Sequence, residues 1–116
     1  MDMSPGDLPM EVTPQEVKRR LDTGERLWLI DVREPEEFRI AQVKGAELIP
    51  MRAIPAALQQ LEAKADEGAL IVFCHHGVRS LQVVNWLREQ GVAECQSMAG
   101  GIDLWSAMVD PAVARY

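Results

Sequence analysis

Apolar residues gather in short runs, separated by longer stretches in which they recur every three or four positions. Most positions within these runs are apolar, without alternation, which is typical of strands buried on both faces of a sheet. They predict strands at 27–32, 46–50, 69–73 and 93–97. The stretches between them predict helices at 13–24, 34–38, 54–65, 79–90 and from 100 onward. Strands that alternate with helices predict an α/β fold with a mostly parallel sheet covered on both faces.

Two of the predicted helices begin with specific signals. Thr13 suits the N-cap of the first helix and Pro14 its first helical position. Glu16, three residues after Thr13, can complete a capping box. The short helix at 34–38 begins with acidic residues, which the positive end of the helix dipole favours. We expect the acidic side chains of this helix to lie in solvent: Glu34, Glu36 and Glu37.

Composition indicates one ordinary globular domain. The chain has 116 residues, of which 47% are hydrophobic and 26% charged. We expect the domain at residues 10–110, a poorly ordered extension at 1–9 and a tail at 111–116. The two cysteines, Cys74 and Cys95, lack CxxC spacing, which argues against a disulfide framework and favours a reducing compartment, the cytoplasm.

Net charge narrows the range of partners. A charge of −6 argues against nucleic acid and anionic membranes. The first seven residues lack the basic and apolar regions of a signal peptide, and no apolar stretch approaches the ~20 residues that span a membrane. An anionic ligand would therefore have to be attracted by a local site.

The segment 74–80, with the sequence CHHGVRS, connects the most apolar strand to the helix that follows it. Ligand sites of parallel sheets gather at the carboxyl ends of strands. Gly77 allows a tight turn that aims several amides at one point, and the helix start adds partial positive charge. These features favour the thiolate of Cys74, and Arg79 adds a cation that can hold an oxyanion through two hydrogen bonds. The segment therefore predicts a nucleophile beside an anion site.

A cysteine at the end of an apolar strand is more often a small buried hydrophobe. The spacing strand–Cys–x–x–Gly–x–Arg–helix favours the nucleophile here, because the glycine and the arginine supply what a reactive thiolate needs.

With these residues the chain resembles the rhodanese-like domain family. The resemblance covers about residues 13–105, and the joint order of its pieces is specific. Those pieces are Cys74-x-x-Gly77-x-Arg79-Ser80, the segment LIDVREPEEF at 29–38, Gly45-Ala46, and Gly100-Gly101 with Trp105.

The resemblance implies a three-layer fold with a five-stranded sheet, and a sulfurtransferase that needs no cofactor. Cys74 would take a sulfane sulfur from a small anionic donor, thiosulfate or another persulfide source. The Cys74 persulfide would pass it to cyanide or to a thiol, a protein thiol included. Arg79 would close a cradle formed by the substrate-binding loop residues His75, His76, Gly77, Val78 and Ser80.

Several alternatives stay open. The related phosphatases of this fold have a longer loop between the cysteine and the arginine than the four residues between Cys74 and Arg79. The shorter loop brings its amides closer to the cysteine sulfur, which suits one extra sulfur atom better than a phosphate group. Some domains of this fold are non-catalytic regulatory or binding modules, which commonly lose the nucleophile or the cation. Cys95 is expected in the core, with a resolving role for the persulfide as the alternative.

The neighbouring histidines also allow more than one interpretation. His75 and His76 could be acid–base groups, but adjacent side chains point apart, so we favour a role at the rim of the loop. Their spacing from Cys74 does not suit a closed zinc site, and we expect no metal. Asp31 and Arg33 are expected to support the fold, with ligand binding by Arg33 as the alternative.

Overall fold

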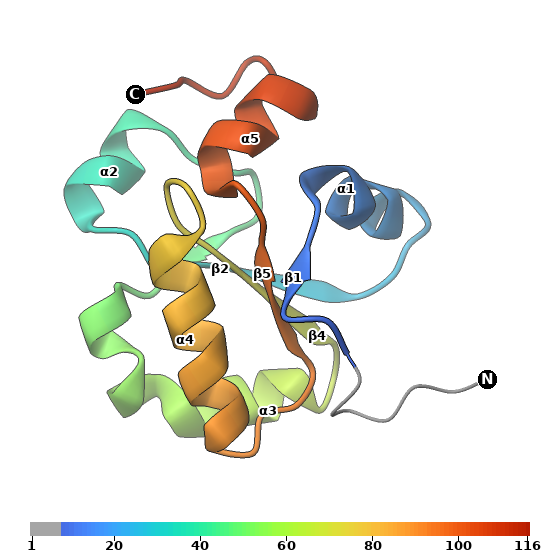
Figure 1. Cartoon of the computed structure of the whole chain (residues 1–116), viewed down its shortest axis with the longest axis vertical. Helices are drawn as coiled ribbons and strands as arrows, with labels where there is room; N and C mark the ends of the chain where they lie inside the picture. The colour runs from blue at the N-terminus through green and yellow to red at the C-terminus, as the bar shows by residue number, and fades with distance from the viewer. Residues whose placement is uncertain (1–7) are drawn as a thin grey trace.

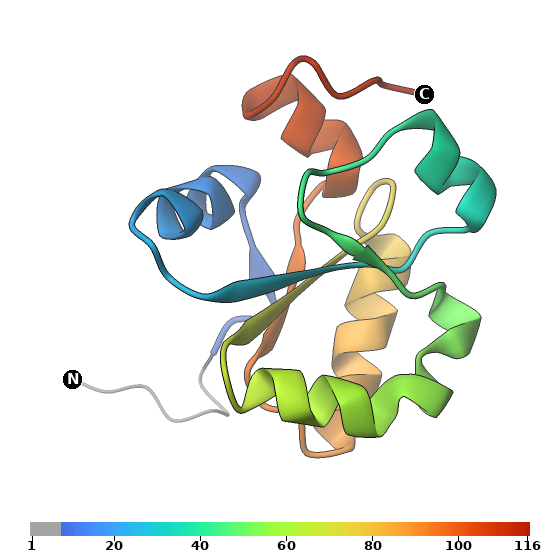
Figure 2. The same ribbon diagram turned by 180° about the vertical axis from the view of Figure 1, so that it is seen from behind.

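The computed structural model describes residues 8–116 and places a five-stranded sheet between two layers of helices (Figures 1 and 2). All strand pairs are parallel, and the order across the sheet is β1-β5-β4-β2-β3. The strands are β1 (Glu11–Val12), β2 (Leu27–Asp31), β3 (Glu47–Leu48), β4 (Ala69–Phe73) and β5 (Cys95–Met98). The α/β fold with a parallel central sheet is confirmed.

The four strands expected from apolar runs are all present, with ends shifted by at most two residues. The fifth, β1, was not expected from the residues, because a two-residue strand leaves no periodic signal. It pairs with Ser97 and Met98 at the edge of the sheet.

Within residues 8–116, five α-helices cover the sheet: α1 (Pro14–Asp22), α2 (Pro35–Ile40), α3 (Leu58–Ala65), α4 (Val78–Glu89) and α5 (Gly101–Met108). Two short 3₁₀ turns, η2 (Met51–Ala53) and η3 (Pro55–Ala57), precede α3. The helix expected at 54–65 is therefore α-helical over only its second part, and its proline-containing start is the tighter 3₁₀ form.

The central strand β4 shows how the core is divided. Alternate side chains of a strand point to opposite faces. Leu70 and Val72 pack with residues of α3 and α4, whereas Ile71 and Phe73 pack with residues of α1 and α5. Both faces are apolar, which explains why the sequence of this strand is apolar throughout.

The helix-start signals are confirmed in part. Thr13 caps α1, and its Oγ1 accepts a hydrogen bond from the Glu16 amide at 3.1 Å. The capping box expected there is wrong, because the Glu16 carboxylate binds Arg19. A capping box occurs at α2 instead, where the Glu37 side chain accepts from the Glu34 amide at 3.0 Å.

Both ends of the described chain pack against the domain. Arg88 donates hydrogen bonds to the carbonyls of Leu8 and Pro9, while the rest of the extension expected to be poorly ordered lies outside the described residues. In the segment 111–116, Val113 is buried in the core and its carbonyl accepts a hydrogen bond from the Ser106 hydroxyl. Within residues 8–116, none of the helices has the length and apolarity needed to cross a bilayer.

Candidate active site

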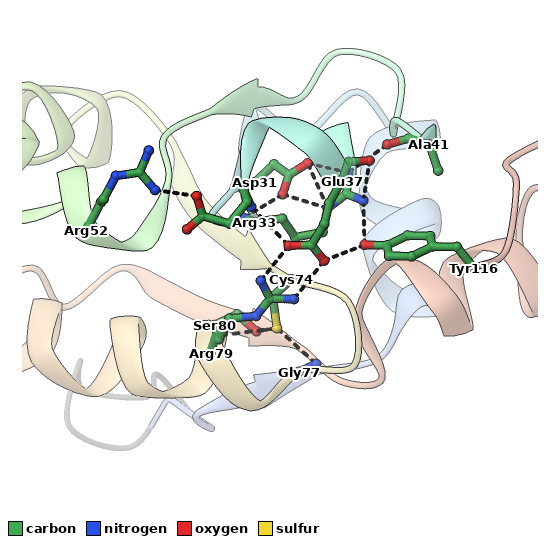
Figure 3. A network of polar contacts seen from close by, with 11 residues as sticks. Asp31, Arg33, Glu37, Ala41, Arg52, Cys74, Gly77, Arg79, Ser80 and Tyr116 are labelled. Carbon is green, nitrogen blue, oxygen red and sulfur yellow. Dashed lines mark hydrogen bonds and ion pairs between the residues drawn. The ribbon is translucent and has the colours of Figure 1, made fainter. Parts of the chain in front are cut away.

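The predicted nucleophile lies at the carboxyl edge of the sheet, where the neighbouring strands β2 and β4 end (Figure 3). Cys74 follows the last residue of β4, and α4 begins four residues later at Val78. Gly77 is the N-cap of α4 and has a left-handed conformation, with φ of +103°. The chain therefore turns sharply between strand and helix, as the glycine predicted.

Two main-chain amides converge on the sulfur of Cys74. The amide of Gly77 donates to Sγ at 3.1 Å, and the amide of Ser80 lies 3.4 Å from the same atom. The Ser80 hydroxyl lies 3.4 Å from Sγ and 2.8 Å from the Ser97 hydroxyl, so it links the sulfur to β5. Cys74 is only 1% exposed. The sulfur is thus enclosed, and the donors around it face inward.

Helix α5 supports this loop from outside. The amides of Ile102 and Asp103 donate to the carbonyls of Cys74 and His75, at 2.9 and 3.1 Å. A Cβ atom on Gly101 would lie 2.4 Å from the Cys74 carbonyl oxygen, so only glycine permits this approach. Because the first two carbonyls of the loop point toward α5, its later amides are free to face the sulfur.

Arg79 is held by a carboxylate of α2. Its two terminal nitrogens lie 2.6 and 3.0 Å from the two carboxylate oxygens of Glu37. The hydrogen bonds from Arg79 lower the pKa of Glu37 to about 2, and Glu37 in turn raises the pKa of Arg79. The expectation that Glu37 faces solvent is wrong, because the chain brings the starts of α2 and α4 to the same sheet edge.

Arg33 is fully buried with Asp31, directly beside this ion pair. Its guanidinium donates to both carboxylate oxygens of Asp31 and to the carbonyls of Glu37 and Ala41. It also donates to the hydroxyl of Tyr116 at 2.8 Å. These contacts occupy the nitrogens of the guanidinium, which indicates that Arg33 supports the fold.

The two histidines do not point apart, so that expectation is wrong. The rings of His75 and His76 stack with centroids 3.8 Å apart, and the ring of Tyr116 stacks on His75 at 3.8 Å and 7°. The tight turn before Gly77 brings the adjacent side chains together. Burial lowers the pKa of His75, and the neighbouring His76 acts in the same direction.

Comparison with known proteins identifies the family. Residues 13–108 match the family described as "Rhodanese-like domain". The chain belongs to this family. A rhodanese-like domain protein from Staphylococcus aureus has the same fold, with a TM-score of 0.77 and 28% identity over 93% of this chain and 99% of that chain.

Relatives of this rhodanese-like domain are named as sulfurtransferases. A "Thiosulfate sulfurtransferase GlpE" of Haemophilus influenzae is 35% identical, over 91% of this chain and 96% of that protein. A "Probable adenylyltransferase/sulfurtransferase MoeZ" of Mycobacterium tuberculosis is 33% identical over 90% of this chain, which spans only 26% of that protein. The relatives support a sulfurtransferase function in general terms.

The other loop residues of the rhodanese-like domain differ in exposure. Val78, in the first turn of α4, is 68% exposed, and His76 is also exposed. Their side chains form the outer rim, whereas Gly77 and Ser80 supply the inner amides.

Cys95 lies far from the loop, at the start of β5. It is fully buried beside Leu70 in the parallel register, and its thiol donates to the Val92 carbonyl at 3.2 Å. Burial raises its pKa to about 11. Leu70 precedes Cys74 by four residues of extended chain, or about 13 Å. Since disulfide formation needs Cα atoms within about 7 Å, the core position expected for Cys95 stands and the resolving role is not supported.

A cluster of possible metal ligands lies at the rim. His75, His76 and Asp103 bring one ligand atom each within 4.8 Å of one another. The imidazole rings are stacked instead of converging, and Arg115 donates to both carboxylate oxygens of Asp103 at 3.0 Å. We assign no metal to this cluster.

Three residues of the site were not found by sequence reasoning: Glu37, Ser97 and Tyr116. One signal was available for Glu37, because it follows a strand next to β4 and could have been placed at the same sheet edge as Arg79. Ser97 and Tyr116 reach the loop from β5 and from the segment 111–116, and neither carries a local signal.

Proposed function

We propose that Cys74 carries a sulfane sulfur as a persulfide and passes it to a thiophilic acceptor. The observation that carries the proposal is the convergence of the Gly77 and Ser80 amides on Cys74 Sγ at the start of a helix. Amides fixed in this way stabilise negative charge without reorganisation. The helix start also leaves the amides of Val78 and Arg79 without intrahelical acceptors.

Loading would proceed by attack of the Cys74 thiolate on the sulfane sulfur of a donor. With thiosulfate, a Cys74 S–S bond forms, the donor S–S bond breaks, and sulfite leaves with the bonding electron pair. The outer sulfur then carries the negative charge, which the loop amides and the positive end of α4 would stabilise. The Ser80 hydroxyl accepts from the Cys74 thiol in this structure and also contacts the Ser97 hydroxyl; once the sulfur is deprotonated, it would become a further donor.

Release would proceed by attack of cyanide or a thiol on the outer sulfur, which regenerates the Cys74 thiolate. An open hollow of about 650 Å³ adjoins the loop and is lined by His76, Gly77, Val78, Met10 and Leu81. Cys74 does not line this hollow, so we assign it only to the parts of an acceptor that remain outside the loop, such as the rest of a protein that carries the thiol. Both cysteines are free, which suits a reducing compartment such as the cytoplasm.

Arg79 has a more limited role than the sequence alone predicts. Because Glu37 engages both terminal nitrogens, we assign Arg79 first to holding the start of α4 and only then to attracting the donor. The alternative of a non-catalytic binding module is less well supported, since Cys74 is present and two main-chain amides face its sulfur.

Mass spectrometry of the intact protein tests the proposal. Incubation with thiosulfate or a small persulfide should add the mass of one sulfur atom, and cyanide or dithiothreitol should remove it. Cys74→Ser should abolish the addition, because it removes the nucleophile. Cys95→Ser, the matched control, should load normally, since that thiol is buried elsewhere. A folded protein that accepts sulfur from no donor would instead support the binding module.

A further inference from the structure

Tyr116 contacts the site through its hydroxyl group, as Figure 3 shows, and also through its ring. Its hydroxyl accepts a hydrogen bond from Arg33 and donates one to Glu37, both at 2.8 Å. Its ring lies flat on that of His75. The preceding residue, Arg115, is paired with Asp103 of α5. The segment is thus fastened at two successive positions.

These contacts join the two walls of the site. Arg33 and Glu37 follow β2, whereas His75 follows the adjacent strand β4 and is the residue next to Cys74. Tyr116 therefore bridges the two strand ends at the edge of the sheet that carries the nucleophile. Cys74, the residue before His75, is 1% exposed in this arrangement.

The two halves of the bridge differ in strength. The hydroxyl meets charged partners, and Arg33 is itself immobilised by the buried Asp31. Burial raises the pKa of Tyr116 to about 12, so the hydroxyl keeps the proton that it donates to Glu37. The other half is a ring stack at the surface, where Tyr116 is 38% exposed. Such a contact can open without disturbing the core.

We propose that Tyr116 is a specificity-determining residue, a clasp that limits by size which reagents reach Cys74. Small donors pass while the clasp is closed, and bulky donors or acceptors need it to open. The proposal deepens the proposed function, on which it rests for the identity of the physiological reagents. The accessibility of Cys74 itself can be measured without any sulfur transfer.

The test compares alkylation of Cys74 by a small and a bulky reagent, iodoacetamide and a fluorescein maleimide, in the native protein. Tyr116→Ala removes the stack and both hydrogen bonds, and should speed the bulky reagent roughly ten- to a hundredfold while changing the small one much less. Tyr116→Phe keeps the ring and loses only the hydrogen bonds, so its effect should be intermediate. Met108→Ala, an exposed residue at the end of α5, is the control and should match the wild type.

The buried thiol of Cys95 serves as an internal control in each sample. An unchanged ratio of bulky to small rates in both Tyr116 variants would overturn the clasp. So would a parallel rise in Cys95 labelling, which would indicate general loosening of the fold. If Tyr116→Ala does not fold, Tyr116→Phe alone decides by the same ratio. If the alkylation ratios change in the Tyr116 variants as expected but no donor loads sulfur onto the protein, the proposed function is rejected and the clasp stands.

Discussion

The environment of a single sulfur atom depends on the backbone angles of a single glycine. Gly77 has φ of +103°, a conformation that L-residues avoid, and this angle turns its own amide toward Cys74 Sγ. A Cβ atom there would also lie 3.2 Å from the Gly100 amide nitrogen. The residue therefore sets both the local turn and the position of a sulfur-binding donor.

Replacing Gly77 separates its conformational role from its chemical one. Gly77→Ala should lower the free energy of unfolding by about 1–2 kcal/mol, the cost of a left-handed L-residue. Gly91→Ala should cost a similar amount, because Gly91 has φ of +95° and open space around it. Urea denaturation measures both changes.

Of the two variants, only Gly77→Ala should slow persulfide loading, by about tenfold. The substitution moves the main-chain amide of residue 77, which donates a hydrogen bond to the charged sulfur. Loading at the wild-type rate in Gly77→Ala would show that this amide does not hold the sulfur.

Between elements, the contact between Glu37 of α2 and Arg79 of α4 fastens two helices at the same sheet edge. The side chains are 19% and 34% exposed, so solvent screens the pair only in part. The pair also fixes the start of α4, whose amides bind the sulfur. Stability and site geometry therefore depend on the same carboxylate.

The titration of Glu37 gives a direct test of this link. Its pKa is about 2 in the folded protein, below the ordinary value of 4.5 that we take for the unfolded chain. Because the folded value is the lower one, the stabilisation is complete above pH 4.5 and is lost as the pH falls toward 2. Glu37→Gln should lower the free energy of unfolding at neutral pH by roughly 1–2 kcal/mol, after allowance for screening.

Urea titrations at several pH values measure the difference, which should vanish in acid. The matched control is Glu36→Gln, since Glu36 is exposed and forms no ion pair within residues 8–116. A constant difference between Glu37→Gln and the wild type down to the acid limit would contradict the assigned pairing.

At the scale of the whole molecule, a net charge of −6 opposes an anionic donor. Glu37 already neutralises Arg79, so the local cation offsets this field only in part. Salt screens the repulsion, with a Debye length of about 10 Å at 0.1 M.

The rate of loading by thiosulfate should therefore rise, by about twofold, as the ionic strength increases tenfold from a low value. Alkylation of Cys74 by neutral iodoacetamide is the control and should stay constant. A loading rate that falls with increasing salt would contradict this account, because it would indicate that the site attracts the anionic donor more strongly than an Arg79 paired with Glu37 can.

The sequence predicted what depends on nearby residues. The apolar run of β4, the cap at Thr13 and the turn at Gly77 each act within a few positions, and all were recognisable. The pairing of Glu37 with Arg79 spans 42 positions, and its contact with Tyr116 spans 79. Such contacts depend on where the sheet brings distant segments together, which local patterns do not encode.

The most direct measurement locates the transferred sulfur within the chain. The protein is treated with thiosulfate or a small persulfide, trapped with iodoacetamide and digested, and the two cysteine peptides are weighed. The Cys74 peptide should carry one additional sulfur atom between the cysteine and the alkyl group, and the Cys95 peptide none. An additional sulfur on Cys95 alone, or on neither peptide with any donor, would contradict a persulfide held by the amides at the start of α4.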